Sequence, residues 1–251
     1  MINTINTKQV QLKNGYFSIG TGKEVILIIG SCRSVPYMNY FSAFNDENDN
    51  RFTVCFIDPF NWNFDLHDNR TNFEEVIDDL KNNDALISLL KNTDICIHEY
   101  YGNYGMFSFD KSADNNIYKA GLNPTIDICI PNFNDRFILF GDIVTFDTDM
   151  RKKAMADYNV IGKLSEETQH EIFQLSQYNL HKFYDICLKS DFPEMKDFFQ
   201  HNMKEKRMFW TSNHVSKEFT YFIFVRLLKK FLGIDLSEEF IRKIYQQPDM
   251  F

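Results

Sequence analysis

The clearest pattern along the chain is a series of short apolar runs separated by longer segments of mixed character. The runs at Glu24–Ile29, Phe52–Ile57 and Asp94–His98 are nearly continuous, as in strands that are covered on both faces of a parallel sheet. Pro36 suits the first turn of a helix after the first run, because its missing N–H costs little there. This alternation of strand and helix predicts an α/β protein with a central, mostly parallel sheet.

Weaker signals predict further elements on either side of this core. A short hairpin is expected over Gln9–Ile19, with its turn at Lys13-Asn14-Gly15. Thr71-x-x-Glu74 matches a capping box, and Ala85–Leu90 either continues that helix or forms a second short one. Two more apolar stretches are strand candidates, of which we expect at least one to form: Thr125–Ile130 and Arg136–Phe140.

From Asp149 onward the pattern becomes mainly helical. Helices are predicted over Ser165–Leu188, after Asp191-Phe192-Pro193, in the segment containing Phe219, Phe222, Ile223, Leu227 and Leu228, and over Ser237–Tyr245. A short strand is expected at Arg207–Trp210. No repeat or low-complexity linker interrupts the chain, so we predict one domain over residues 1–251, with 149–203 as a helical insertion or cap.

Composition narrows the classes of function. The formal net charge of −8 argues against a general nucleic-acid binder, which needs a basic face to displace counterions. The five cysteines are scattered without a CxxC pair, which favours a reducing compartment. Neither a signal-peptide pattern nor an apolar run of membrane-spanning length is present. We therefore expect a soluble, cytoplasmic protein without a membrane span.

The loop Gly30-Ser31-Cys32-Arg33, directly after the first predicted strand, is the leading candidate for chemistry. In open α/β sheets ligands bind at the carboxyl ends of strands, often against the first turn of the next helix. The positive end of the helix dipole would favour the thiolate form of Cys32, and Arg33 could add to this effect or bind an anionic group. Backbone N–H groups of the turn could stabilise an oxyanion. The alternative is a small residue packed at a tight turn.

Two later segments could complete such a site. His214 follows a predicted strand and precedes a helix, so it could act as a general base, with Asn213 orienting the loop or donating to an oxyanion. The alternative is a helix cap at this position. Asn103, after Gly102 in the loop that follows His98, could donate its amide N–H to an oxyanion.

Other kinds of site have less support. Cys32, Asp58, His98 and His214 could meet at one sheet edge, but they lack the close ligand spacing of zinc sites, and we predict no metal. Neither GxxxxGK[ST] nor a GxGxxG after the first strand occurs. Nucleotide hydrolysis and Rossmann-type dehydrogenation are therefore disfavoured.

The order of three short blocks resembles a known group. Gly30-Ser31-Cys32, Gly102-Asn103 and Asn213-His214 occur in the order of the SGNH-type hydrolase blocks. The sequence is more similar to the WcbI-type polysaccharide-biosynthesis acetyltransferases, which carry a Gly-Asn-Cys-like first loop and an Asn-His-Pro-like late motif. The resemblance implies a three-layer, SGNH- or flavodoxin-like α/β sandwich with a helix-rich C-terminal half. It also implies a coenzyme A site and acyl transfer to a sugar hydroxyl.

The resemblance implies a role for one residue of each block. Cys32 takes the position of the nucleophile, Asn103 that of the oxyanion-hole asparagine and His214 that of the late catalytic histidine. The chain departs from the pattern at three places. Ser31 stands where SGNH hydrolases have Asp and the WcbI type has Asn, and Val215 replaces the usual proline. Thr211 stands three residues before His214, where SGNH enzymes carry Asp, so His214 lacks a sequence-adjacent carboxylate.

The first functional hypothesis is an acetyltransferase that moves an acyl group from coenzyme A, its co-substrate, to a carbohydrate-like hydroxyl. The residues expected to bind coenzyme A are Gly30, Ser31, Arg33 and Asn213. An SGNH-like esterase with Cys32 in the nucleophile slot is one alternative. The other is a catalytically inactive ligand- or partner-binding protein, of viral or phage origin as the asparagine-rich composition suggests.

Overall fold

The computed structural model describes residues 16–58, 82, 84–100, 109, 111–112, 116–131, 148–203, 205–206, 208 and 215–246. The chain divides into two compact units. The first comprises Met1–Ile130 and Phe224–Pro248, and the second comprises Pro131–Ile223 and Asp249–Phe251. The expectation of a single domain with 149–203 as an insertion or cap stays a prediction.

The described part of the first unit contains a five-stranded sheet with the order β1-β3-β2-β4-β5. Its strands are β1 (Tyr16–Ile19), β2 (Glu24–Ile29), β3 (Phe52–Ile57), β4 (Ile95–Glu99) and β5 (Ile126–Ile130). β1 pairs antiparallel with β3, and the remaining pairs are parallel. The α/β class and the mostly parallel sheet predicted from the sequence are confirmed.

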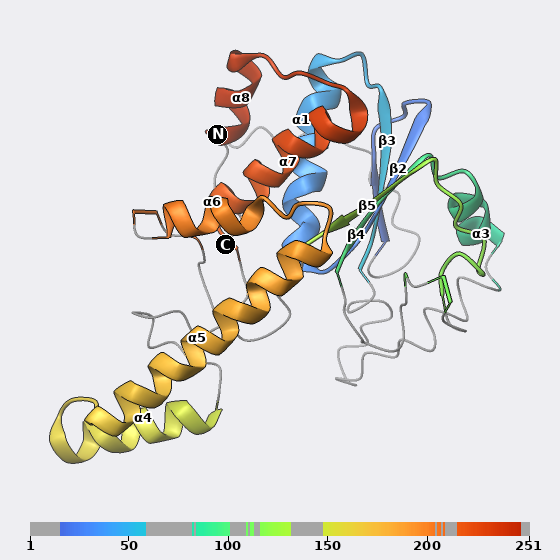
Figure 1. Ribbon diagram of the computed structural model, residues 1–251. Helices are drawn as coiled ribbons and strands as arrows, with labels where there is room; N and C mark the ends of the chain where they lie inside the picture. The colour runs from blue at the N-terminus through green and yellow to red at the C-terminus, as the bar shows by residue number, and fades with distance from the viewer. Residues whose placement is uncertain are drawn as a thin grey trace. The chain divides into compact units, whose positions relative to one another are not determined.

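Helices cover both faces of this sheet, an arrangement compatible with a three-layer α/β fold (Figure 1). The turn after β2 forms a short 3-10 helix, η1 (Cys32–Ser34), and continues into α1 (Val35–Glu47) on one face. On the other face lies α3 (Asp84–Lys91), which buries Leu86 and Leu90 in one core cluster with alternate residues of β2, β3 and β4. The continuous apolar runs of the sequence thus form strands whose side chains are buried in two cores, one on each side of the sheet.

Aromatic side chains fill the core between the sheet and α1. The Phe41 ring lies 5.7 Å from that of Phe52 on β3 and 5.1 Å from that of Phe224 on α7 (Lys217–Leu232). All three side chains are fully buried. Burial of each phenylalanine stabilises the fold by about 1.5–3 kcal/mol, so this cluster is a large part of what holds α1 in place.

The last helix of the chain packs against the far end of α1. α8 (Glu238–Tyr245) begins at Ser237, whose hydroxyl accepts a hydrogen bond from the Phe240 amide. The Phe240 ring lies 5.8 Å from that of Phe44, and Lys243 Nζ lies 2.5 Å from Glu47 Oε1. The predicted helix at Ser237–Tyr245 is confirmed, and its first residue acts as the cap.

The regular elements described in the second unit are helices. It contains α4 (Thr148–Ile161), α5 (Glu166–Lys189), α6 (Met195–Asn202) and the first turns of α7. Lys153 joins α4 to α5 through ion pairs with Glu167 and Glu171, at 3.1 and 2.5 Å. Phe183 packs its ring 4.8 Å from that of Phe199 on α6. The helices predicted for this half of the chain are confirmed.

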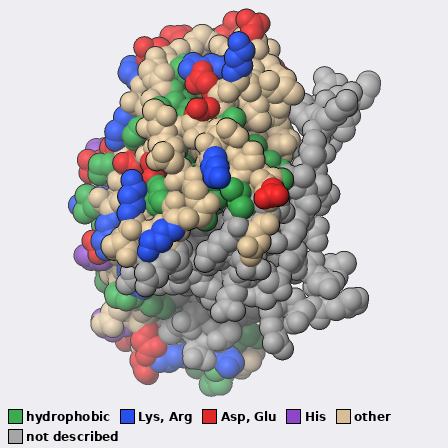
Figure 2. Space-filling model, turned by 90° about the vertical axis from the view of Figure 1, so that its right-hand side faces the viewer, with side chains coloured by type: hydrophobic (Ala, Val, Ile, Leu, Met, Phe, Trp, Pro, Cys, Tyr) green, Lys and Arg blue, Asp and Glu red, His purple; other side chains and the backbone are tan. Residues whose placement is uncertain are grey.

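Several predicted elements lie outside the described residues. These are the turn at 13–15, the capping box at 71–74, the loop at 102–103, the strand candidate at 136–140 and most of the strand expected at 207–210. Within the described segments, none of the helices combines the length and apolar character that crossing a bilayer requires. On the face shown in Figure 2, basic and acidic side chains are interspersed among the described residues, and the basic ones form no single patch.

Candidate functional site at the carboxyl end of the sheet

The turn Gly30–Ser34 leaves the sheet at a position where α/β proteins place ligands. β2 lies between β3 and β4, so the chain moves from β2 to one side of the sheet and later crosses to the other. Ligands of open α/β sheets bind outside the carboxyl strand ends at such a switch point. The Gly30 amide still donates to the Ile57 carbonyl at 3.1 Å, so the turn begins directly at the sheet edge.

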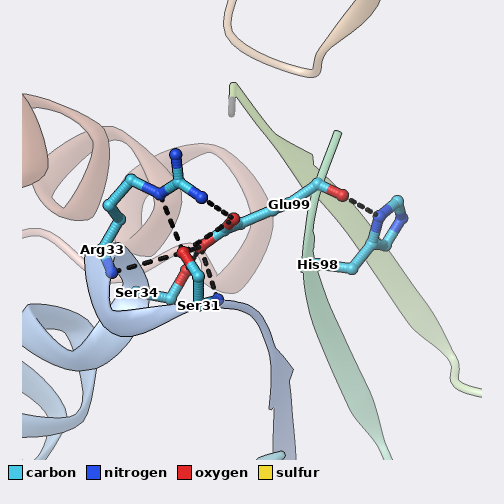
Figure 3. A network of polar contacts seen from close by, with 5 residues as sticks. All are labelled: Ser31, Arg33, Ser34, His98 and Glu99. Carbon is cyan, nitrogen blue, oxygen red and sulfur yellow. Dashed lines mark hydrogen bonds and ion pairs between the residues drawn. The ribbon is translucent and has the colours of Figure 1, made fainter. Parts of the chain in front are cut away.

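A buried carboxylate, Glu99, holds this turn from the neighbouring strand (Figure 3). Glu99 ends β4, and its side chain is 2% exposed. Its Oε1 atom accepts hydrogen bonds from the Ser31 amide at 2.9 Å, the Ser31 hydroxyl at 3.0 Å and the Ser34 hydroxyl at 2.5 Å. A carboxylate with several donors is the kind of buried anion that a protein interior tolerates.

Arg33 supplies the opposite charge in the same network. Its Nε atom donates to the Ser31 hydroxyl at 2.8 Å, and its Nη2 atom lies 4.0 Å from Glu99 Oε2. Ser31 therefore accepts from Arg33 while its own hydroxyl donates to Glu99. Because both charges are buried, removing either one would take a nearby opposite charge from the other, at an energetic cost.

Gly30 is required by the closeness of this packing. A Cβ atom at Gly30 would lie 2.4 Å from Ser34 Oγ and 2.9 Å from Glu99 Oε1. Both distances are shorter than van der Waals contact, so any side chain here would displace the network. The glycine that the sequence places at the end of β2 thus makes room for the Glu99 carboxylate.

Ser34 precedes α1, yet its side chain does not cap the helix. Its hydroxyl is directed instead to Glu99. The Ser31 amide, one of the N–H groups expected to be available for an oxyanion, likewise donates to Glu99. The polar groups of the turn are therefore organised around an internal anion.

A second polar cluster lies on the opposite face of the sheet, because neighbouring strand residues alternate in direction. His98 stacks on Phe109 with ring centroids 3.6 Å apart and an interplanar angle of 5°. Its Nδ1 atom lies 3.3 Å from the Glu99 carbonyl oxygen, and its Nε2 atom lies 3.5 Å from Asp127 Oδ1. Both ring nitrogens thus lie near oxygen atoms of the surrounding structure.

Asp127 also accepts a hydrogen bond from the Tyr118 hydroxyl. Burial, and then the hydrogen bond to Asp127, raise the pKa of the Tyr118 hydroxyl above its ordinary value. Burial and the nearby Asp127 carboxylate hold the pKa of the Cys96 thiol well above its ordinary value. Both groups therefore stay neutral at physiological pH, and Cys96 behaves as a small buried hydrophobe.

Among the described residues, no group of three or more His, Cys, Asp or Glu side chains is arranged to hold a metal ion. Gly30, Ser31 and Arg33, expected to bind coenzyme A, are brought together around Glu99. The Cys32 side chain and the residues Asn103, Asn213 and His214 lie outside the described part of the structure. Their proposed roles stay predictions.

Sequence reasoning missed Glu99, Ser34 and Asp127. The expected strand ended at His98, and Glu99 was assigned to the following loop, whereas β4 includes it. The sequence offers one weak signal, an acidic residue directly after an otherwise apolar strand, which marks Glu99 as a candidate but shows neither its burial nor its partners.

Comparison with known proteins adds no relative. No protein-family model matches the chain, and neither a curated protein nor a solved structure shows significant similarity to it.

Proposed function

We propose that this chain is a coenzyme A-dependent acyltransferase that acts on a carbohydrate-like hydroxyl, built on an SGNH-like form of the α/β fold. The observation that carries the proposal is the position of the Gly30–Ser34 turn at the carboxyl end of β2, where the strand order reverses between β2 and β4. The buried Arg33 guanidinium in this turn suits the phosphates of an acyl donor such as acetyl-CoA.

Acyl transfer to a hydroxyl needs three things: a base for the hydroxyl proton, donors for the oxyanion, and a bound thioester. By the resemblance of the sequence blocks, His214 would be the base and Asn103 an oxyanion donor. Cys32 would be either a nucleophile that carries the acyl group or a polar wall beside the thioester. A direct transfer uses only the base and the donors, whereas a covalent route also requires a base close to the thiol.

Binding of coenzyme A is the first test. A ligand at about 100 times its dissociation constant stabilises a fold by about 2.7 kcal/mol, which a thermal-shift assay detects. We expect acetyl-CoA and coenzyme A to raise the unfolding temperature and adenosine to have no such effect. The absence of a shift at millimolar coenzyme A would remove the coenzyme A part of the proposal.

Turnover is the second test. With acetyl-CoA and a panel of mono- and oligosaccharides, we expect release of free coenzyme A that depends on the acceptor. His214→Ala should reduce this release by at least about 100-fold, the usual size of a general-base contribution. Cys32→Ala should abolish it on the covalent route and reduce it less on the direct route. Exposed Glu238→Gln on α8 is a control for nonspecific effects. Full turnover in both site variants would refute the catalytic roles of Cys32 and His214.

One observation favours a second candidate, a ligand-binding protein without catalysis. The Ser31 amide and the Ser31 and Ser34 hydroxyls donate to Glu99, so the described polar groups of this turn already serve an internal carboxylate. An oxyanion would then depend on donors from elsewhere in the chain. Tight binding of coenzyme A without turnover against any acceptor would support this candidate over the acyltransferase.

We also propose a cytoplasmic location. The described cysteines whose side chains are placed are all free thiols: Cys55, Cys96, Cys129 and Cys187. Free thiols are typical of proteins that work in a reducing compartment. Cell fractionation of a tagged chain tests this proposal, and recovery of the protein in an exported fraction would contradict it.

A further inference from the structure

The helical hairpin formed by α4 and α5 carries most of the large apolar side chains that the described part of the chain exposes. On α4 these are Met155, Tyr158, Val160 and Ile161, with exposed fractions of 56, 46, 81 and 50%. Of the α4 side chains that are described, only Ala154 is buried. A helix that is apolar around most of its circumference is normally covered on more than one side, so contact with α5 alone leaves α4 incompletely covered.

Polar contacts between α4 and α5 define one side of this hairpin and the alignment of its two helices, which lie side by side (Figure 1). Lys153 pairs with Glu167 and Glu171. Closer to the turn, Asp157 accepts hydrogen bonds from the Ser165 amide and hydroxyl, at 2.9 and 2.7 Å. The helices are therefore antiparallel, and one residue forward on α4 corresponds to one residue back on α5. The ion pairs occupy one side of the pair and leave the opposite side to other residues.

The side of the hairpin opposite the ion pairs is apolar. Met155 follows Lys153 by two residues, and Phe173 follows Glu171 by two residues. Each therefore lies about 200° around its helix from the ion-paired residue. Tyr158 comes three residues after Met155, on the same face of α4. Met155, Tyr158 and Phe173, each about half exposed, thus share one side of the hairpin, here called the apolar side.

We propose that the apolar side is a dimer interface, at which two copies of this chain associate through their hairpins about a two-fold axis. The axis crosses the hairpin level with Ala154. Along the antiparallel alignment, Tyr158 lies about four residues from this level toward the turn, and Phe173 lies about five residues from it in the other direction. Two-fold symmetry therefore sets Tyr158 of each copy against Phe173 of the other. Coenzyme A plays no part in this association, which goes beyond the proposed function.

The exposed apolar area is large enough for a dimer of modest affinity. Ile161, three residues beyond Tyr158, extends the apolar side by one turn of α4. At about half exposure, each of the four side chains offers on the order of 100 Å², so each copy supplies about 400 Å². Stable interfaces take about 600–800 Å² from each partner, of which slightly more than half is apolar. The apolar side meets this requirement at the smaller end, which corresponds to association at micromolar concentration.

Charged residues beside the apolar side favour a second copy of this chain as the partner. Lys152, three residues before Met155, and Glu166, seven residues before Phe173, are both exposed and lie on the same faces as those apolar residues. Along the alignment they lie about two residues from the level of Ala154, in opposite directions. The two-fold axis therefore brings Lys152 of each copy to Glu166 of the other. One charge of each sign, at equal distances from the axis, suits self-association better than a partner of uniform charge.

Sedimentation equilibrium of the full chain, between about 1 and 100 µM, is the first test. We expect a reversible equilibrium between monomer and dimer. A monomer at the highest concentration overturns the inference and would assign the apolar side to a different partner. An assembly that grows beyond the dimer also overturns it, because a two-fold interface closes on itself. Since no coenzyme A is present, failure of the proposed acyltransferase activity leaves this result unchanged.

Substitutions on the two sides of α4 show which side associates. Tyr158→Glu and Phe173→Glu should each weaken dimerisation by at least about 10-fold, because symmetry places each substitution in the interface twice. Val160→Glu is the matched control. Val160 is more exposed than Tyr158 but lies seven residues after Lys153, on the side of the ion pairs, so this variant should dimerise like wild type. Equal loss of the dimer in Val160→Glu and Tyr158→Glu overturns the assignment, and circular dichroism verifies that each variant is folded.

Charge reversal tests the two-fold arrangement itself. Lys152→Glu and Glu166→Lys each place like charges together at two symmetric positions, and each should weaken the dimer by about 3- to 10-fold at low salt. The double variant restores opposite charges and should recover most of the wild-type affinity. Single variants with wild-type affinity, or additive weakening in the double variant, would overturn this arrangement even if a dimer forms.

Discussion

The Ser34 hydroxyl donates a 2.5 Å hydrogen bond to Glu99 Oε1, across a separation of 65 residues in the sequence. This bond joins the residue before α1 to the last residue of β4, two elements between which the chain passes through β3 and α3. Together with the Ser31 contacts, it makes one carboxylate the common partner of the turn. The stability of the turn should therefore depend on Glu99 more than on any single residue within it.

Replacement of Glu99 tests this dependence. We expect Glu99→Ala to reduce the free energy of unfolding by about 3–5 kcal/mol, because the buried Arg33 loses a nearby negative charge and two hydroxyls lose their acceptor. Glu99→Gln keeps the size and one acceptor oxygen, and should cost less than Glu99→Ala. Urea unfolding followed by circular dichroism measures both.

The matched control for this series is Glu47→Ala, which removes a partly exposed carboxylate paired with Lys243. Surface ion pairs contribute about 0–1 kcal/mol, so this variant should stay close to wild type. Equal losses in Glu99→Ala and Glu47→Ala would show that the buried network adds no stability.

Gly30→Ala is expected to destabilise the protein by about 1–3 kcal/mol, the usual range for overpacking. The added methyl group would lie 2.6 Å from Ser34 Cβ as well as close to its hydroxyl. Ser34→Gly removes that obstacle, so the double variant should lose less stability than the sum of the two single variants. Strict additivity in a double-mutant cycle would show that the two positions do not contact each other.

Alkaline pH should destabilise the protein from about pH 9 upward. Burial raises the pKa of the Cys96 thiol in the folded state well above its ordinary value of 9.0, with a further contribution from Asp127. Above pH 9 the thiol ionises in the unfolded chain but stays protonated in the folded chain, so the free energy of unfolding falls as pH rises. Each such group contributes a slope of about 1.4 kcal/mol per pH unit.

Cys96→Val isolates the contribution of this thiol. Between about pH 9 and 10, before tyrosines ionise in the unfolded chain, the variant should show a shallower decline in urea midpoint than wild type. The wild-type slope itself should exceed that of one group, since burial also raises the pKa values of Cys55 and Cys187. Identical slopes in variant and wild type would mean that Cys96 ionises equally in both states.

Tyr118→Phe should cost about 0.5–1.5 kcal/mol, the net contribution of a typical hydrogen bond, because Asp127 loses the hydroxyl that donates to it. Asp127→Asn provides the complementary test. Without the carboxylate, the pKa of Tyr118 should fall toward its ordinary value, although burial still raises it. Ultraviolet titration of tyrosine ionisation in the folded protein measures this change, and no downward shift would exclude the influence of Asp127.

The strands of the sheet could be predicted because each is marked by an apolar run within one short segment of the chain. The runs at Glu24–Ile29 and Phe52–Ile57 are continuous and apolar, and both become parallel strands with the expected bounds. The position of Gly30 at a strand end was equally visible. Which helices cover which face was not, since either face of a continuous apolar strand can be buried against a helix.

The hydrogen bonds of the polar network could not be predicted from the sequence, for a different reason. Ser31, Ser34 and Glu99 become neighbours only when β2 and β4 pair, and that pairing is a long-range event. A glutamate at a strand end is common and by itself indicates neither burial nor a partner. Arg33 was identified from its position beside Cys32. Its orientation, however, depends on the carboxylate of Glu99, at the end of β4.

The alternation of His98 and Glu99 at the end of β4 also has a consequence for how the chain folds. A slip of β4 by one residue would turn Glu99 toward the apolar cluster of Leu27 and Leu86 and away from Ser31. Such a misaligned strand would bury a carboxylate without donors, at a cost of several kcal/mol. Apolar residues along β4 tolerate either alignment, so these two polar residues are what makes the wrong one unstable. The same carboxylate that shapes the turn thus also favours the correct register of β4 in the sheet.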